Sequence, residues 1–345
     1  MPISNGESSD HDSTAYDGGT SIPDKSVRGL ASLAWEDWYG TPGNTGDVEK
    51  LRQRLAIDRH PDDCATAMHY VRLLGESSRR AIPELKQLMR HAEQKSLRMN
   101  AATVIAEIDP AESAIVLPVL LAGLADNDRG IWASATHGLG FLGTAAMSAI
   151  PQLKAMLEID DEMTIVSAAG AIVRIAPSEH ESVIPILVEL LKESDSFYQG
   201  FVIDILAEIG PSAVAAVELL RQLSVSDETL TSQEASIAVG KVTGDWNSAL
   251  DVGVRLFKSL QSTDEDNLPT DAFLDRLVAQ GFWLSLGPHA VAGIPRLEAE
   301  CGSASDYVRE RIQETVEWIR SGKSEDEALS SIPGMPVILS IGGFA

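Results

Sequence analysis

Residues 143–157 read GTAAMSAIPQLKAML, and the same phrase occurs twice more in the chain. It appears as GESSRRAIPELKQLM at 75–89 and as GPHAVAGIPRLEAEC at 287–301. Each copy has Gly, seven residues, Pro, one residue and Leu. Self-similarity at a fixed spacing is the signature of repeat proteins. The sequence therefore predicts one structural unit that is written many times.

The proline position gives the period of the repeat. Pro83, Pro118, Pro151 and Pro185 are separated by 35, 33 and 34 residues. Glu218 and Val252 continue this register, and an insertion near QSTDEDNLP precedes Pro295. A second apolar segment follows each proline segment, with small and then large apolar residues three or four positions apart. We interpret each unit as two antiparallel helices that bury their apolar stripes only against the next unit.

The helix breakers fit this interpretation. Proline is tolerated near the start of a helix, where its missing N–H costs nothing, or at a bend along it. Glycine accepts the left-handed geometry that ends many helices. We therefore expect the second helices to end at Gly75, Gly143, Gly210, Gly244 and Gly287.

This pattern resembles the HEAT repeat, particularly the short bacterial form of phycobilisome lyase subunits. The resemblance covers about residues 47–320. Arg98 and Arg276 match the arginine that the family often carries in the first turn of the second helix, whereas Trp132, Ile165 and Gln199 depart from it. The resemblance implies an all-α fold, an α-solenoid that forms a right-handed superhelix of about eight antiparallel helix pairs. We place the pairs at roughly 47–75, 76–109, 110–143, 144–176, 177–210, 211–244, 245–287 and 288–320.

The two ends differ from the repeats. Residues 1–30 are rich in Ser, Asp, Gly and Thr, which is typical of disorder. Residues 31–46 are interpreted as a capping helix and linker, in which Trp35 and Trp38 cover the first repeat or stack on a ligand. Residues 321–345 are expected to form an extended apolar tail that lies on the last repeats or docks on another protein.

Composition limits the functional classes. The chain has 345 residues and a net charge of −24, although residues 51–100 carry ten basic and six acidic side chains. Such a negative field repels phosphate backbones, so we expect no nucleic acid partner. The apolar stretch 114–125 is too short to cross a bilayer, and we expect no membrane contact. Cys64 and Cys301 are isolated, and the first residues lack a secretion signal, which together favour the cytoplasm.

Two sequence motifs suggest a cofactor or metal site, but neither has the neighbouring elements or spacing that such a site requires. GLGFLG at 138–143 matches a dinucleotide fingerprint, but that fingerprint needs a strand before it and a helix after it. In HPDDCATAMH (60–69), Cys64 and His69 are five residues apart and turn away from each other on a helix. The sequence thus predicts no cofactor, no metal and no catalytic residue.

One charge pattern indicates a binding surface more clearly than these motifs indicate a site. The turns between the two helices of consecutive pairs are acidic, and stacking should align them along one edge about 10 Å apart. They are helix caps that stay hydrated, or a ridge that attracts a basic partner. The ridge candidates are Asp126, Asp128, Asp160, Asp161, Glu162, Asp195, Asp227 and Glu228. The acidic and basic ends also permit weak head-to-tail self-association.

We therefore expect a non-enzymatic scaffold that holds a protein or peptide in a concave groove lined by the second helices. The candidate groove residues are Arg98, Asn100, Trp132, His137, Gln199 and Asp204. The alternative is an enzyme or an enzyme subunit like the lyase relatives that handle a chromophore.

Overall fold

The structure is a computed structural model that describes residues 45–194, 196–226, 229–260 and 270–323. Every regular element in these ranges is helical. The segment 1–30, nearly all of 31–46, the insertion at 261–269 and the tail from 324 lie outside the described residues. The α-helices are α2 (Thr45–Arg54), α3 (Pro61–Leu74), α4 (Ile82–His91), α5 (Lys95–Ile108), α6 (Ser113–Gly123), α7 (Arg129–Leu142), α8 (Ile150–Met156), α9 (Glu162–Ile175), α10 (His180–Glu193), α11 (Ser196–Ile209), α12 (Val217–Leu223), α13 (Thr229–Thr243), α14 (Asn247–Ser259), α15 (Thr270–Ser285), α16 (Ile294–Glu300) and α17 (Asp306–Ser321).

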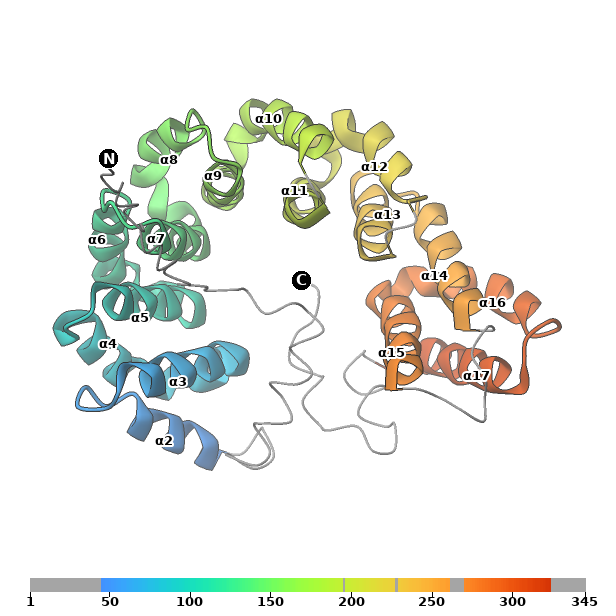
Figure 1. Cartoon of the computed structure of the whole chain (residues 1–345), viewed down its shortest axis with the longest axis horizontal. Helices are drawn as coiled ribbons and strands as arrows, with labels where there is room; N and C mark the ends of the chain where they lie inside the picture. The colour runs from blue at the N-terminus through green and yellow to red at the C-terminus, as the bar shows by residue number, and fades with distance from the viewer. Residues whose placement is uncertain (1–44, 195, 227–228, 261–269, 324–345) are drawn as a thin grey trace, which may run out of the picture.

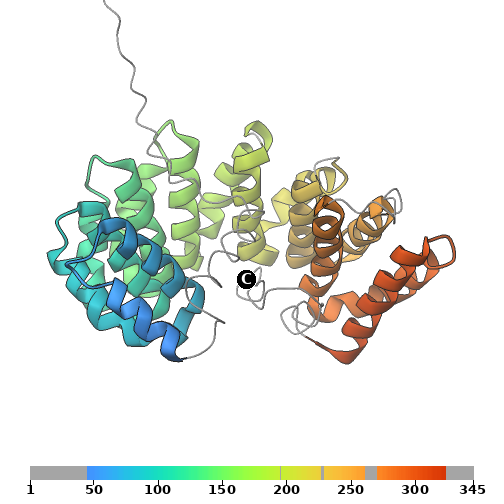
Figure 2. The ribbon, with the colours of Figure 1, turned by 60° about the horizontal axis from the view of Figure 1, so that its bottom comes forward.

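The helices alternate between two layers of an open arc (Figure 1). The even-numbered helices lie outside, and the odd-numbered helices α3 to α15 lie inside. From α3 to α13, each inner helix packs against the next inner helix, while its outer partner covers it from behind. Turned by 60°, the molecule shows the same helices standing side by side along the arc (Figure 2). The all-α fold and the stacking of neighbours are confirmed.

Glycine decides how one pair is joined to the next. Gly75, Gly143, Gly210 and Gly287 have φ between 52° and 67°, and each opens a seven-residue 3₁₀ helix before the next outer helix. Asp109 and Ala176 stand at the corresponding joints with φ of −151° and −136°. Because a side chain disfavours the left-handed region, these two joints use a three-residue 3₁₀ helix, and the next α-helix begins earlier.

This difference explains the prolines. After the glycine joints, Pro83, Pro151 and Pro295 lie at the start of α4, α8 and α16, where no N–H is needed. After the short joints, the earlier start leaves Pro118 and Pro185 inside α6 and α10. Both expected positions for the repeated proline therefore occur.

The core is built from small side chains in the inner layer. Ala101, Ala135 and Ala168 have no exposed surface, and the larger Leu139 and Ile172 close the space around them. The buried residues form two clusters, one running from Leu51 to Val242 and one from Ala249 to Ile319. No single globular centre is present in the described part of the chain.

The boundary between the clusters coincides with a break in the inner layer. Helix α13 packs on α14 but makes no substantial contact with α15 within the described ranges. Side chains bridge this joint: the Trp246 ring lies against Gly240 of α13 and also stacks on His289 with centroids 4.1 Å apart. Arg255 of α14 donates to the Ser224 carbonyl over 2.7 Å. Helices α14 to α17 thus form a block that side chains tie to the helices before it.

Ion pairs link successive units with a fixed polarity. Between α2 and α11, each inter-unit pair has its base in the earlier unit and its acid in the later one. These pairs are Arg52–Glu84, Arg72–Glu107, Lys86–Glu112, Lys95–Asp126, Arg129–Asp161, Lys154–Glu179 and Arg174–Glu208. Exposed pairs contribute little energy, but a consistent polarity favours one order of stacking.

One segment has the length and hydropathy of a membrane span. It runs from Phe197 to Leu223, and half of its apolar window is buried in the protein. Here it forms two helices, α11 and α12, because Gly210 with φ +67° opens a 3₁₀ turn between them. Its apolar character matches the core that these helices build.

Candidate functional site

Each inner helix exposes one stripe of residues. Its outer partner and its two inner neighbours cover the other sides, so the exposed stripe faces the inside of the arc (Figure 1). On α11 the stripe is Phe197, Phe201, Asp204 and Glu208, which are spaced three or four residues apart. We call the surface formed by these stripes the inner face.

The inner face is apolar at the N-terminal ends of three successive helices. Met163 of α9, Phe197 and Phe201 of α11 and Leu230 of α13 form what we call the apolar strip. Phe197 is 54% exposed and Leu230 is 49% exposed. The Phe197 and Phe201 rings lie 5.3 Å apart in an edge-to-face arrangement. Grouped apolar side chains of this kind mark contact sites for other proteins.

The opposite end of the same face is charged. Arg72 of α3 pairs with Glu107 of α5 over 2.5 Å and also contacts His137 Nε2 of α7 over 3.1 Å. Arg174 of α9 pairs with Glu208 of α11 over 2.9 Å. We call these five residues the charged row. The two ion pairs join consecutive inner helices and the Arg72–His137 contact spans from α3 to α7, so the row extends over the inner helices α3 to α11.

Two members of the charged row have shifted pKa values. His137 keeps exposed surface, yet its ring lies among crowding side chains and packs edge-on against Phe141. Loss of hydration, followed by the positive charges of Arg72 and Arg174, lowers the pKa of His137 to about 4. Burial raises the pKa of Glu107, although Arg72 opposes that rise. At neutral pH His137 is therefore an uncharged acceptor for Arg72.

Three of the expected groove residues lie elsewhere. Arg98 turns back from the first turn of α5 and donates to the Ala92 carbonyl over 2.5 Å. Trp132 Nε1 donates to the Asp126 carbonyl. Gln199 donates to the Leu191 carbonyl over 3.2 Å. The three side chains occupy the same position in their units and satisfy carbonyls near the end of the preceding outer helix, which takes their donors off the inner face.

The other three expected groove residues have mixed surroundings. Asn100 is half-buried and accepts a hydrogen bond from Ser134 of α7 over 2.9 Å, so it joins two inner helices. Asp204 is exposed on the stripe of α11. His137 belongs to the charged row. The structure thus brings His137 and Asp204 to the inner face and uses Asn100 between helices.

The acidic turns are partly neutralised. Lys95 pairs with Asp126 and Arg129 pairs with Asp161, each over 2.9 Å. The charges of these two acids are therefore matched by the preceding unit. Asp128 and Asp160 are exposed and Glu162 is half-buried, whereas Asp195, Asp227 and Glu228 lie outside the described residues.

Asp128 and Asp161 also cap helices, as expected. The carboxylate of Asp128 accepts from the N–H groups of Gly130 and Ile131 at the start of α7. Asp161 accepts from the Thr164 N–H and hydroxyl, which together with Arg129 lower its pKa. Capping by a side-chain oxygen satisfies an N–H that the helix leaves open.

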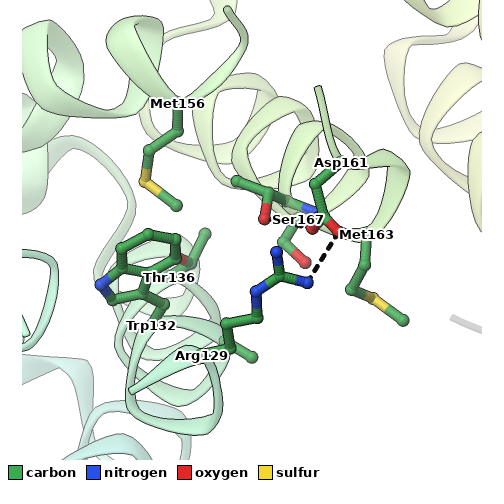
Figure 3. Close-up of a pocket in the computed structure, with 9 residues that line it drawn as sticks. Arg129, Trp132, Thr136, Met156, Asp161, Met163 and Ser167 are labelled. Atoms are coloured by element: carbon green, nitrogen blue, oxygen red, sulfur yellow. Dashed lines mark hydrogen bonds and ion pairs between the residues drawn. The ribbon is translucent and has the colours of Figure 1, made fainter. Parts of the chain in front are cut away.

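A cavity of about 70 Å³ lies between α7 and α9, next to the apolar strip (Figure 3). Its lining includes Trp132, Ala133, Met156 and Met163. The Arg129–Asp161 ion pair and Ser167 also line it. Thr136 lines it too.

Groups with metal or thiol chemistry do not gather in the described ranges. Cys64 is buried and donates to the Arg54 carbonyl, and Cys301 is a second free thiol; burial raises the pKa of both. No cluster of three His, Cys, Asp or Glu side chains there could hold a metal ion.

The geometry defines an all-α protein of stacked helix pairs. No protein-family model matches the chain, and no curated protein matches it. Solved structures do match, and they show structural similarity to HEAT-like proteins.

Three such structures are similar to this chain. The CpcE–CpcF complex of phycocyanin lyase from Nostoc sp. PCC7120 is 19% identical, with 69% of this chain and 94% of that chain covered and a TM-score of 0.42. An engineered protein is 23% identical, with 58% and 99% covered and a TM-score of 0.40. The karyopherin Kap121p, bound to the extreme C-terminus of the phosphatase Cdc14p, is 13% identical, with 92% and 37% covered and a TM-score of 0.41. These likenesses concern the fold alone.

Proposed function

We propose that this protein is a non-enzymatic scaffold that binds a protein or peptide along its inner face. The observation that carries the proposal is the apolar strip, where Phe197 and Leu230 expose about half of their surface on adjacent helices. Large apolar side chains kept in water at neighbouring positions have a cost in solubility that a bound partner would remove. The charged row at the other end of the same helices supplies polar contacts and direction.

Two further features support the scaffold. The cavity between α7 and α9, at about 70 Å³, is far below the roughly 300 Å³ at which drug-sized ligand sites begin. The charged row forms ion pairs along an open face. The enzyme alternative needs a deep pocket with a converging charged pair. The cavity has such a pair, Arg129–Asp161, but its volume of about 70 Å³ is small for a substrate site.

We further infer eight helix pairs wound as a right-handed superhelix, in the cytoplasm. The net charge of −24, with Asp128 and Asp160 exposed at the turns, favours a protein partner with basic segments. The same charge disfavours a nucleic acid partner. Binding should then weaken as salt rises. Head-to-tail contact between two copies remains a weaker proposal, tested by the mass of the protein at low salt.

Site-specific photocrosslinking tests the proposal. A benzophenone amino acid replaces Phe197 on the inner face. The matched control has the same amino acid at Val214, which is 67% exposed and lies on the 3₁₀ turn before the outer helix α12. The proposal expects discrete adducts in native cells from position 197 and none of them from position 214. Identical adducts from both positions, or none from 197, would refute it. A partner found in this way is then purified, and Leu230→Asp should weaken its binding.

A further inference from the structure

The apolar strip carries its side chains at one equivalent position of three successive helices. Met163, Phe197 and Leu230 are each the second residue of their inner helix. The second residue is Ser96 in α5 and Gly130 in α7, so the stacking of inner helices does not require an apolar side chain there. The strip is therefore a local surface feature of α9, α11 and α13 and not a part of the repeated core.

The chain itself contains a segment of matching chemistry. Residues 331–345 read SIPGMPVILSIGGFA and carry no charged side chain, although the whole chain has a net charge of −24. The segments 1–44 and 261–269, which also lie outside the described residues, carry nine and three charged side chains. Because apolar groups gain free energy on leaving water, the segment 331–345 is the best match in the chain for an exposed apolar surface.

The strip and this segment also have matching lengths. Packed neighbouring helices lie about 10 Å apart, so the strip extends over about 20 Å from α9 to α13. Six extended residues cover the same length at about 3.3 Å each. Residues 336–341 read PVILSI, and an extended chain places Val337, Leu339 and Ile341 on one side. The two prolines in 331–345 disfavour a helix, which leaves an extended form as the expected one.

The segment is long enough to reach the strip from the end of α17. Helix α17 contacts α15, α15 contacts α14, and α14 contacts α13. At about 10 Å for each step and about 22 Å for the length of α13, Leu230 lies at most about 50 Å from the end of α17. Leu339 is 16 residues beyond Lys323, the last described residue, and an extended chain of that length spans about 53 Å. The residues after Leu339 can then continue toward α9.

We propose that residues 331–345 bind the apolar strip within the same molecule, with their aliphatic side chains against Phe197 and Leu230. The inference shares the strip with the proposed function, but its occupant is supplied by the chain itself. Because the connection to α17 holds the segment near the strip at an effective concentration of about millimolar order, a weak contact is sufficient. An external partner then has to displace the segment, which lowers the apparent affinity of that partner.

Disulfide trapping on the full chain tests the contact. The background variant is Cys301→Ser, and Cys64 stays because it has no exposed surface. Leu339→Cys is combined either with Leu230→Cys on the strip or, as the matched control, with Val214→Cys on the outer layer. We expect an intramolecular disulfide to form at least about tenfold faster with the cysteine at 230, because a bound segment has a much higher local concentration there. Equal rates for the two pairs, or a disulfide that links two copies of the chain, would overturn the inference.

A further substitution tests whether apolar contact holds the segment. Phe197→Asp, added to the 230–339 cysteine pair, should slow the disulfide to about the rate of the Val214 control, since an apolar contact is lost. Met147→Asp, at a 50% exposed position of the 3₁₀ helix 143–149, should leave the rate unchanged. An equal rate in the two variants overturns the inference. An external partner that crosslinks to position 197 while no 230–339 disulfide forms removes only this inference, and the reverse result removes only the proposed function.

Discussion

Replacing Trp283 by alanine tests whether the two core clusters unfold separately. Trp283 has no exposed surface, and its indole lies against Gly253 of α14 and Gly293 of the turn before α16. A Cβ at those glycines would lie 2.6 Å and 2.4 Å from the ring, so the ring fills its site completely. The side chain belongs to the second cluster, which begins at Ala249.

The size of the effect follows from the burial of the ring. Truncating a buried Trp to Ala costs about 3–5 kcal/mol. The Trp283 indole N–H has no hydrogen-bond partner among the described residues, so the variant also removes a penalty of about 1–3 kcal/mol. At the midpoints of these ranges the net loss is about 2 kcal/mol. Because 1.4 kcal/mol is a factor of ten, amide exchange through local opening should accelerate about 30-fold.

Hydrogen exchange with mass spectrometry on the full chain measures where this loss falls. In a stack that is stabilised by neighbours, we expect faster exchange in α16 and α17 and unchanged exchange in α5 and α7. Leu139→Ala in the first cluster is the matched control and should give the opposite pattern. Equal acceleration in both blocks would show a single cooperative core and refute the reasoning.

Two further predictions concern polar groups. Asp161→Ala removes the cap of α9 and should lower the free energy of unfolding by about 1 kcal/mol. Arg129→Gln removes only an exposed ion pair and should lower it by less than about 0.5 kcal/mol. Equal losses of the two variants in urea unfolding would contradict this. His137 has a pKa of about 4 in the folded protein and about 6.5 when unfolded, so the unfolded chain binds more protons between these values. Stability should therefore fall as pH drops from 6.5 to 4. In His137→Gln this fall should be smaller by about 1 kcal/mol, allowing for solvent screening, and an unchanged pH profile in urea titrations would count against it.

The sequence predicted the architecture because each unit repeats the same local physics. Glycine at the joints, small residues in the inner helices and the recurring proline are visible as spacing alone. The two joint types were visible as well, since Asp109 and Ala176 replace glycine there, but their consequence needed the structure. Only the observed φ values show that these joints start the next helix early and leave Pro118 and Pro185 inside it.

The site was harder to predict, because periodicity gives a face and not the direction of a long side chain. Arg98, Trp132 and Gln199 lie in the first turn of an inner helix, yet their donors reach back to turn carbonyls. Apart from His137, the charged row was not predicted, because its members come from different units and meet only through packing. Its signal was present nonetheless: Glu107, Arg174 and Glu208 are each the thirteenth residue of an inner helix, with signs that alternate between neighbouring units α9 and α11.

The apolar strip has no distinct signal in the sequence. Phe197 and Leu230 are apolar like the residues that build the core. They lie one turn before the buried stripe begins, at the open ends of α11 and α13, where no neighbouring helix covers them completely. Hydrophobicity alone does not distinguish these two environments.

The fixed polarity of the inter-unit ion pairs has a consequence for how such a chain can lengthen. The units from α4 to α9 each present acids to their predecessor and bases to their successor. A tandem duplication of one of these units in the gene would therefore place the base-bearing face of the first copy against the acid-bearing face of the second. In this part of the chain, units can be added by copying while the order of charges across the interfaces is kept.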